Sequence, residues 1–271
     1  MSLGGDRFFA GSIPDIYDAY LVPLIFEAFA SDLARRAADA EPVEILETAA
    51  GSGVVTRALA PLLRKDACYV VSDLNQPMLD RAARRQDPDG RIAWRQADAL
   101  DLPFTDESFD AVICQFGVMF FPDRISGYRE TRRVLKPNGR FLFNVWDRIE
   151  ANDFARIATE AVSAIFSDDP PRFLARIPHG YHDVDEIAAD LRAAGFSNIE
   201  IATLEKTSDA PNARAPAIAY CQGTPLRNEI EARDPASLHA ATERAAEALA
   251  RAFGDGPVSG RIRGHVIVAS A

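Results

Sequence analysis

A run of small residues directly after an apolar segment constrains the fold of this chain more than any other feature. Residues 43–47 are mostly apolar and end in the acid Glu47, residues 48–53 are small, and a helical pattern begins at Val54. A strand, tight turn and helix of this kind bring backbone close to a ligand without collision of side chains. A second acid, Asp73, ends the next apolar run, twenty residues after Gly53. At that distance a nucleotide-binding α/β fold presents a carboxylate to ribose hydroxyls.

Predicted strands and helices alternate along the chain, which indicates a parallel sheet covered by helices on both faces. Residues 199–204 and 261–269 alternate like two further strands, and residues 137–139 predict a turn that ends a helix. Before the first strand, Pro23 predicts a break or kink in a helix near Val22. The central strands are predicted up to Thr48 and at 67–73, 91–96, 111–115 and 140–146, and the central helices at 54–64, 77–86 and 124–135.

Five segments, taken in order, resemble the class I S-adenosylmethionine-dependent methyltransferases. The first is residues 47–53, in which Glu47, Ala49, Gly51 and Gly53 have the spacing of the first motif of that family. Alanine in place of the first glycine is common in the branch that includes the ubiquinone and menaquinone biosynthesis enzymes. The others are residues 73–79, 96–104, 108–116 and 133–140.

The resemblance implies an α/β fold with a Rossmann-like, seven-stranded, mostly parallel sheet of order 3-2-1-4-5-7-6. Helices are expected on both faces, together with a helical cap. Residues 1–271 would form one methyltransferase domain, with lid helices in residues 1–40 and the cofactor-binding core in residues 41–146. Residues 147–182 and 211–253 would form the cap that receives the substrate.

The resemblance further implies S-adenosyl-L-methionine as the cofactor. Gly51 and Gly53 would admit its methionine end, Glu47 would meet its ammonium group, Asp73 both ribose hydroxyls, and Asp98 the adenine amino group. The methyl group of Ala49 is tolerated in a tight turn only if φ is negative there, because it disfavours the left-handed region. The other residues expected at the cofactor are Tyr20 from the lid, Ala49, Leu74, Met78, Ala99, Gln115 and Phe116.

The predicted reaction is methyl transfer to a small-molecule acceptor by in-line displacement, which alignment and exclusion of water can promote. A base is optional. His179 and His182 flank Tyr181, and the hypothesis is that one of them takes a proton from a phenol or hydroxyl acceptor. The alternative is a structural role, in which His182 helps to cap the helix that Asp183 begins.

Two other functions stay open. A non-catalytic S-adenosylmethionine-binding sensor or partner-binding module would carry the same motifs. An NAD(P)-dependent oxidoreductase is less favoured, because its fingerprint requires glycine where Thr56 stands.

Composition points to a small-molecule enzyme. The net charge of −10 disfavours nucleic acid as a partner. Cys68, Cys114 and Cys221 lack Cys-x-x-Cys spacing and predict neither a metal site nor a disulfide, and the first two are expected in buried strands. The sequence shows no signal peptide and no membrane-spanning segment, so we expect a cytoplasmic protein without integral membrane association. A homodimer stays open.

Overall fold

A computed structural model describes residues 13–271, so residues 1–12 of the expected lid region lie outside it. The described chain forms two compact units. The sheet unit comprises Glu27–Val145, His182–Leu204 and Gly264–Ala271. The helical unit comprises the described residues up to Phe26, together with Trp146–Tyr181 and Glu205–Arg263.

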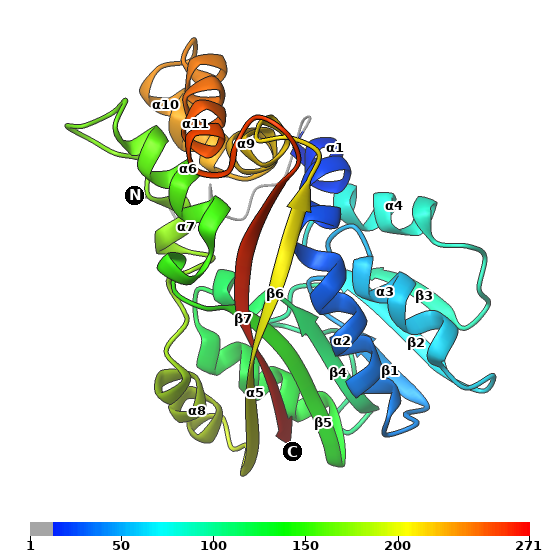
Figure 1. Cartoon of the computed structure of the whole chain (residues 1–271). Coiled ribbons are helices and arrows are strands. Elements are labelled where there is room, and N and C mark those ends of the chain that lie inside the picture. The colour runs from blue at the N-terminus through cyan, green and yellow to red at the C-terminus, as the bar shows by residue number, and fades with distance from the viewer. Residues whose placement is uncertain (1–12) are drawn as a thin grey trace. The chain divides into compact units, whose positions relative to one another are not determined.

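The strands form one mixed sheet of order β3-β2-β1-β4-β5-β7-β6, which confirms the predicted order. The pairs among the first five strands are parallel, and the arrows of β6 and β7 run in opposite directions (Figure 1). The strands are β1 (Glu44–Glu47), β2 (Cys68–Asp73), β3 (Ile92–Gln96), β4 (Phe109–Gln115), β5 (Leu135–Trp146), β6 (Asn198–Ala210) and β7 (Val258–Ser270).

The helices alternate with these strands as expected. The α-helices are α1 (Ile13–Ile16), α2 (Glu27–Ala38), α3 (Val54–Leu59), α4 (Gln76–Arg85), α5 (Arg124–Val134), α6 (Asp153–Ser163), α7 (Phe173–Arg176), α8 (Val184–Ala193), α9 (Arg214–Gln222), α10 (Leu226–Arg233) and α11 (Leu238–Phe253). A π-helix, η2 (Tyr17–Phe26), joins α1 to α2, and short 3₁₀ turns occupy Ala60–Leu62, Val118–Phe120 and Ile149–Ala151.

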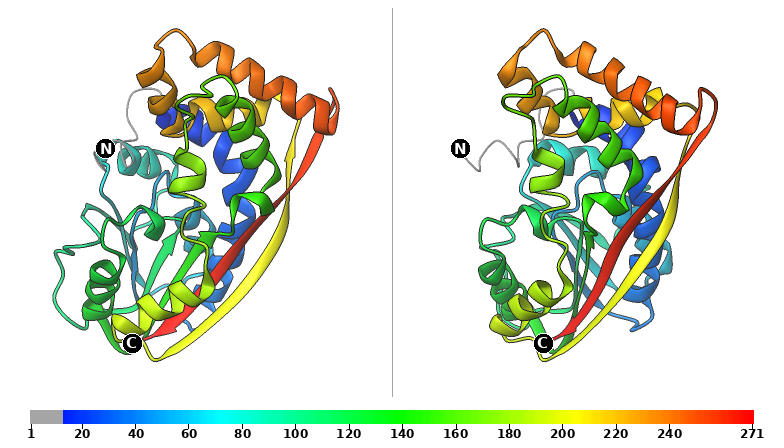
Figure 2. Two further views of the ribbon diagram at one scale, coloured as in Figure 1. Left: turned by 90° about the vertical axis from the view of Figure 1, so that its left-hand side faces the viewer. Right: turned by 60° about the vertical axis from the view of Figure 1, so that its left-hand side comes forward.

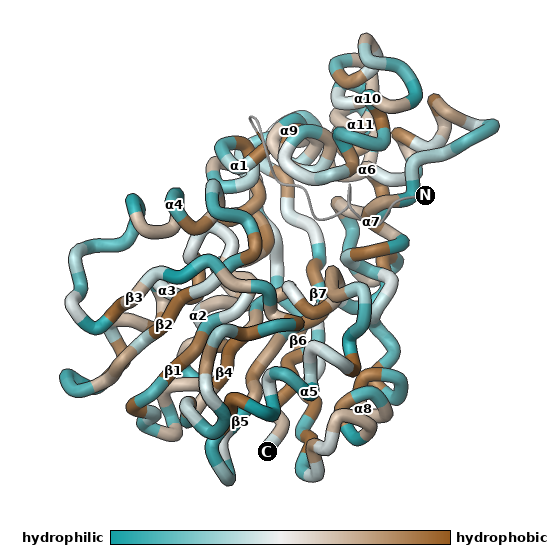
Figure 3. Tube along the Cα trace, turned by 180° about the vertical axis from the view of Figure 1, so that it is seen from behind, coloured by the Kyte–Doolittle hydropathy of each residue, from teal (hydrophilic) through white to brown (hydrophobic). Residues whose placement is uncertain are grey.

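The sheet unit buries apolar side chains on both faces of the sheet. On one face, Leu33 of α2 and Leu59 of α3 pack with Ile45 and Ile113 of the central strands. On the other, the Tyr128 ring of α5 lies 5.8 Å from the ring of Phe141. The tube coloured by hydropathy shows β1 and β4 as apolar segments between more polar helices (Figure 3). Burial on both faces explains why these strands read as continuous apolar runs.

The helical unit has an apolar core of its own. Helix α11 packs against α6 and α9, and α9 packs against η2. The Phe154 ring meets the Phe253 ring edge-on at 5.2 Å between centroids. Gly260 leaves room for Phe154, because a Cβ at that position would lie 2.8 Å from its ring. Figure 2 shows α9 and α11 from two sides.

Two local predictions were wrong, and a third, a break or kink at Pro23, was met by a different irregularity. Pro23 does not break the helix; it lies within η2, where the wider π-turn accommodates a residue that lacks an N–H. Strand β5 begins at Leu135 rather than Arg140, because the chain pairs with Phe109 before residues 136–139 bulge outwards. Cys68 is exposed rather than buried, since it is the first residue of β2, whereas Cys114 and Cys221 are buried.

Asp110 holds the start of β1 against β4. Its Oδ2 accepts hydrogen bonds from the N–H groups of Val43 at 3.0 Å and Glu44 at 2.8 Å, and its Oδ1 accepts one from Lys136 Nζ at 2.9 Å. Burial alone would raise the pKa of Asp110, but these hydrogen bonds outweigh it and keep the pKa below its usual range.

We therefore expect Asp110→Ala to lower the free energy of unfolding by about 1–3 kcal/mol at pH 7, because two strand-end N–H groups lose a charged acceptor. Since the folded pKa is depressed, the contribution of Asp110 should be present above the unfolded pKa and should disappear as the pH falls through the folded pKa. Urea denaturation at pH 7 and at pH 3 measures both effects. Equal losses at the two pH values would contradict this role.

Candidate active site

The turn after β1 has the backbone that a close-fitting ligand requires. Gly51 and Gly53 have φ angles of 57° and 77°, which glycine adopts readily. A Cβ at Gly53 would lie 2.9 Å from the Cβ of Ala82 in α4, so no larger residue fits there without a shift. The Ala50 N–H donates to the Ser72 carbonyl oxygen at 3.0 Å, which joins the turn to the end of β2.

The condition that alanine at residue 49 needs a negative φ was wrong, because the φ of Ala49 is 51°. The left-handed conformation costs an L-residue about 1–2 kcal/mol, so neighbouring contacts must hold it in place. One such neighbour is Gly117: a Cβ there would lie 2.6 Å from the Ala49 Cβ and 2.7 Å from Cys114 Sγ. The turn can therefore have alanine at residue 49 because Gly117, in the neighbouring loop, has no side chain.

Asp73, at the end of β2, joins two loops. Its Oδ2 accepts from the Gly51 N–H at 2.8 Å, and its Oδ1 accepts from the Asn75 N–H at 2.7 Å. Burial raises the pKa of Asp73, and these hydrogen bonds act against that shift. A carboxylate has about four acceptor positions, so this arrangement retains capacity for a ligand hydroxyl.

Glu47, at the end of β1, is almost completely buried. Its Oε2 accepts hydrogen bonds from Thr56 Oγ1 at 2.7 Å and from the Tyr69 hydroxyl. Burial raises the pKa of Glu47 from 4.5 to about 7, against the opposing effect of these two hydrogen bonds. The same burial, together with the charge of Glu47, raises the pKa of Tyr69. A cationic ligand group would favour the ionised form of Glu47.

The residues expected to contact adenine and ribose lie in the segments that come after β2 and β3. Asp98 Oδ1 accepts from the Leu100 N–H at 3.0 Å, which orients the carboxylate. Ala99 is buried beside it, and Met78 is buried in α4. Leu74 is 41% exposed, which leaves its apolar side chain accessible. The roles of these four residues at the cofactor stay predictions.

Gln115 and Phe116 lie where β4 ends. Phe116 has a φ of 50°, and its ring meets that of Phe29 edge-on at 5.3 Å between centroids. Its N–H donates to the carbonyl oxygen of Asn144 in β5 at 3.2 Å. Positive φ is uncommon for an aromatic residue, and strained backbone of this kind gathers at functional sites. The site therefore has left-handed residues after two adjacent strands.

The proposed lid and base residues belong to other elements. Tyr20 lies on η2 in the helical unit and is 39% exposed. His179, in the same unit, is buried, and its Nδ1 lies 2.8 Å from the Asp147 carbonyl oxygen. Because a carbonyl only accepts, Nδ1 carries the proton, and the neutral ring then has its lone pair on Nε2. The roles of Tyr20 and His179 stay predictions.

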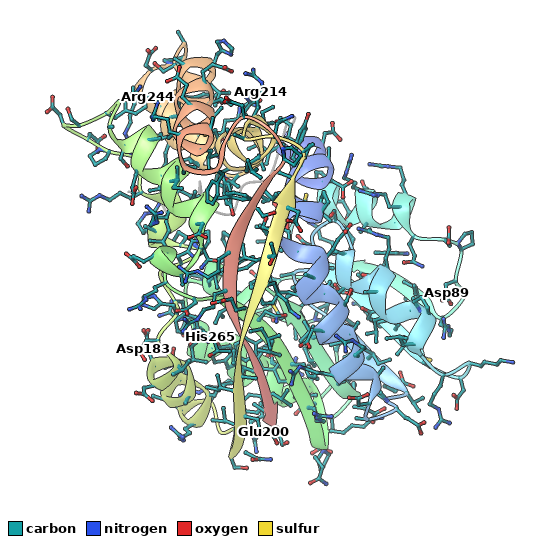
Figure 4. All side chains as sticks on the ribbon, viewed as in Figure 1. Asp89, Asp183, Glu200, Arg214, Arg244 and His265 are labelled. Atoms are coloured by element: carbon teal, nitrogen blue, oxygen red, sulfur yellow. The ribbon has the colours of Figure 1, made fainter. Side chains whose placement is uncertain are left out.

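His182 belongs to the sheet unit and is partly buried. Asp183, which is labelled in Figure 4, caps α8, because its side chain accepts from the N–H groups of Asp185 and Glu186. The cap is thus supplied by the aspartate. The role of His182 as a base stays a prediction.

Sequence reasoning missed several residues of the site. Thr56 and Tyr69 bind Glu47, and the Ser72 hydroxyl donates to the Glu47 carbonyl oxygen at 2.9 Å. Gln96 Nε2 donates to the Leu74 carbonyl oxygen at 2.9 Å and so connects the ends of β3 and β2. Strand alternation could have indicated Tyr69, since it shares a face with Val71 two residues before Asp73.

The described residues fit S-adenosylmethionine. Carboxylates stand at the ends of β1 and β2 and just after β3, where they could bind ammonium, ribose and adenine groups. The Ser52 hydroxyl, in the turn itself, is buried and has no hydrogen-bond partner within residues 13–271. A buried polar atom without a partner is what a bound ligand would satisfy.

Comparison with known proteins agrees with this geometry. Residues 46–143 match a family described as a methyltransferase domain. A demethylmenaquinone methyltransferase from Corynebacterium urealyticum is 33% identical over 175 residues, which cover 61% of this chain and 73% of the relative. One of the same name from Clavibacter sepedonicus is 32% identical over 171 residues, covering 58% of this chain and 66% of the relative, just under two thirds of its length.

Solved structures share the fold. A structure described as a putative methyltransferase from Bacillus halodurans has a TM-score of 0.56 at 21% identity, covering 90% of this chain and 98% of that one. A Thermotoga maritima protein described as a SAM-dependent methyltransferase has a TM-score of 0.52 at 15% identity and covers 95% and 97%.

The chain belongs to the class I S-adenosylmethionine-dependent methyltransferases, in the branch of the ubiquinone and menaquinone biosynthesis enzymes. It is an enzyme, and its cofactor is S-adenosylmethionine. The predictions of fold, enzyme class and cofactor are thereby confirmed.

The contact between Ala49 and Gly117 can be tested by coupling two substitutions. Ala49→Gly should raise the free energy of unfolding by about 0.5–1 kcal/mol, because glycine tolerates the left-handed conformation. Gly117→Ala should lower it by about 1–3 kcal/mol through overpacking, and by less in the Ala49→Gly background. Gly90→Ala is the matched control, since a Cβ there meets nothing within 4 Å. Additive effects in a double-mutant cycle would contradict the contact.

Burial of Glu47 predicts a dependence of stability on pH. Its folded pKa of about 7 lies above the ordinary value of 4.5, so the folded protein binds the proton more tightly. The stability that this proton contributes should be complete below pH 4.5 and should be lost as the pH rises to about 7. Glu47→Gln, which mimics the protonated acid, should therefore gain stability relative to the wild type at pH 8 but not at pH 4.5. Thermal unfolding without cofactor measures the difference, and parallel curves at both pH values would refute it.

Proposed function

We propose that this enzyme transfers a methyl group to a small-molecule acceptor by in-line displacement, and that the acceptor is an electron-rich hydroxylated ring of the quinol type. The observation that supports the acceptor class most directly is the activity in the names of the relatives, which methylate demethylmenaquinone. Another relative, from Bartonella bacilliformis, is named a ubiquinone/menaquinone biosynthesis C-methyltransferase and is 29% identical over 168 residues. A ring activated by a hydroxyl group is nucleophilic at carbon and at oxygen.

The residues of the site contribute binding and alignment. S-adenosylmethionine supplies a methyl group on a positively charged sulfur, which an acceptor atom displaces. Asp73 holds the turn at Gly51 and would bind the ribose, while Glu47 would meet the ammonium group. Phe116 and Gln115, after β4, would line the methionine end and exclude water there. Alignment of this kind can supply several kcal/mol of the barrier reduction.

A proton must leave the acceptor when the methyl group arrives. We infer that His179 is the better candidate of the two histidines to receive it, because its Nδ1–H is held by a carbonyl and Nε2 is then the basic nitrogen. Loss of a true base should lower the rate about a hundredfold or more without weakening cofactor binding. Normal turnover of His179→Ala and His182→Ala would leave alignment as the mechanism.

None of the helices within residues 13–271 has the length and apolarity that crossing a bilayer demands. The cap over the site, a homodimer, the absence of a nucleic-acid partner and the cytoplasmic location stay predictions.

Asp73 provides the main test of the cofactor site. Asp73→Ala should weaken S-adenosylhomocysteine binding by about 2–4 kcal/mol, because charge-assisted hydrogen bonds to the ribose and the hold on Gly51 are lost together. Asp66→Ala, at an exposed carboxylate paired with Arg64, is the matched control and should bind normally. Isothermal titration calorimetry gives the affinities. Unchanged affinity of the Asp73 variant, or tight binding of NADH by the wild type, would refute the assignment.

The acceptor class has its own test. With S-adenosylmethionine present and oxygen excluded, the wild type should form a methylated product and S-adenosylhomocysteine from 1,4-dihydroxynaphthalene. Mass spectrometry identifies the product and shows whether carbon or oxygen carries the methyl group. Cofactor binding without product from any hydroxylated ring would overturn the quinol class while leaving the cofactor assignment intact.

A further inference from the structure

One buried amide of the sheet unit, that of Asn144, has no hydrogen-bond partner on either of its polar atoms within residues 13–271. Asn144 lies on β5, in a stretch that is otherwise apolar, and its side chain is completely buried. Neither its Oδ1 nor its Nδ2 has a hydrogen-bond partner within residues 13–271. Burial of an amide without partners costs free energy, and a native structure rarely retains it without a reason.

The position of Asn144 relates it to the cofactor site. It is paired in register with Gln115 of β4, and its carbonyl oxygen accepts from the N–H of the strained Phe116. Side chains alternate along a strand, so Asn144 projects from the same face as Leu142, which packs with Ile113 and Val266. The amide therefore stands beside the Gln115 side chain at the carboxyl end of the sheet.

The order of the strands in the sheet gives the order in which the groups of the cofactor would be bound along its edge. The proposed contacts with adenine follow β3, those with ribose follow β2, those with the methionine ammonium follow β1, and Gln115 at the sulfonium end follows β4. The next strand in the sheet is β5, and Asn144 is the polar residue two positions before its end at Trp146. The group beyond the sulfonium end is the methyl acceptor, since the methyl group leaves in that direction.

From this placement we propose that the Asn144 amide binds a hydroxyl or carbonyl oxygen of the methyl acceptor and positions its ring. An amide both donates and accepts, so it recognises an oxygen in either form. The proposal rests on the proposed methyl transfer to a hydroxylated ring. It makes Asn144 a specificity-determining residue: a site with a buried hydrogen-bonding group discriminates against a substrate that lacks the complementary group.

Stability provides the first test, because a second buried asparagine serves as a matched control. Asn152 has the same burial, but its Nδ2 donates to the carbonyl oxygens of Asp147 at 3.2 Å and Arg148 at 3.1 Å, and its Oδ1 accepts from the Arg263 N–H at 2.9 Å. Leucine has the shape of asparagine without its polar atoms. Asn152→Leu should lower Tm by about 5 °C or more, whereas Asn144→Leu should leave Tm unchanged or raise it.

Substrate discrimination provides the second test. The wild type should prefer 1,4-dihydroxynaphthalene to 1-naphthol, which lacks one hydroxyl group, by about tenfold or more in kcat/KM. In Asn144→Leu this preference should shrink to about threefold or less, with S-adenosylhomocysteine affinity unchanged. A role in folding alone would lower both rates equally and leave the preference as it is.

The outcomes separate the two proposals. A fall in Tm of Asn144→Leu as large as that of Asn152→Leu would show that the amide has partners in the free protein, and would overturn its assignment whether or not an acceptor is known. Retained preference in a stable variant would overturn it as well. Absence of wild-type product from both naphthols would instead count against the acceptor class of the proposed function, and the comparison of Tm values would still decide on Asn144.

Discussion

The carboxylate of Asp73 fixes two loops of the cofactor site at once. One oxygen accepts from the Gly51 N–H in the turn after β1, and the other accepts from the Asn75 N–H after β2. Without this link, the turn would have no charged acceptor to hold its backbone, and the turn would not orient the Asp73 carboxylate. Glu47 and the end of β4 lie at the same edge of the sheet as Asp73, since β1 lies between β2 and β4.

Strain and burial are concentrated at this edge. Ala49 and Phe116 adopt positive φ angles after adjacent strands, and Glu47 is buried with its pKa raised by desolvation. Each feature costs stability, and the rest of the unit holds it in place. Gly117, which has no Cβ, leaves room for the Ala49 methyl group, and the hydroxyl groups of Thr56 and Tyr69 donate to Glu47. Buried acids and strained backbone that are paid for elsewhere are characteristic of binding sites.

The helical unit contains Tyr20 and His179, whose roles at the site stay predictions. Its core is formed by α6, α9 and α11, and its histidine, His179, is held by the Asp147 carbonyl. In the sheet unit, by contrast, each carboxylate of the cofactor motifs has identified partners.

The sequence by itself determined the strand ends at which Glu47 and Asp73 lie, the family and, through the resemblance to that family, the sheet order, because strand periodicity and the spacing of Glu47, Gly51, Gly53 and Asp73 are local properties of the chain. It did not determine the conformation of Ala49, the helical course through Pro23 or the partners of Glu47. Those depend on contacts between residues far apart in sequence, such as Ala49 with Gly117. Only the tertiary structure showed that Asn144 is a buried amide beside Gln115, since register between β4 and β5 decides which side chains become neighbours.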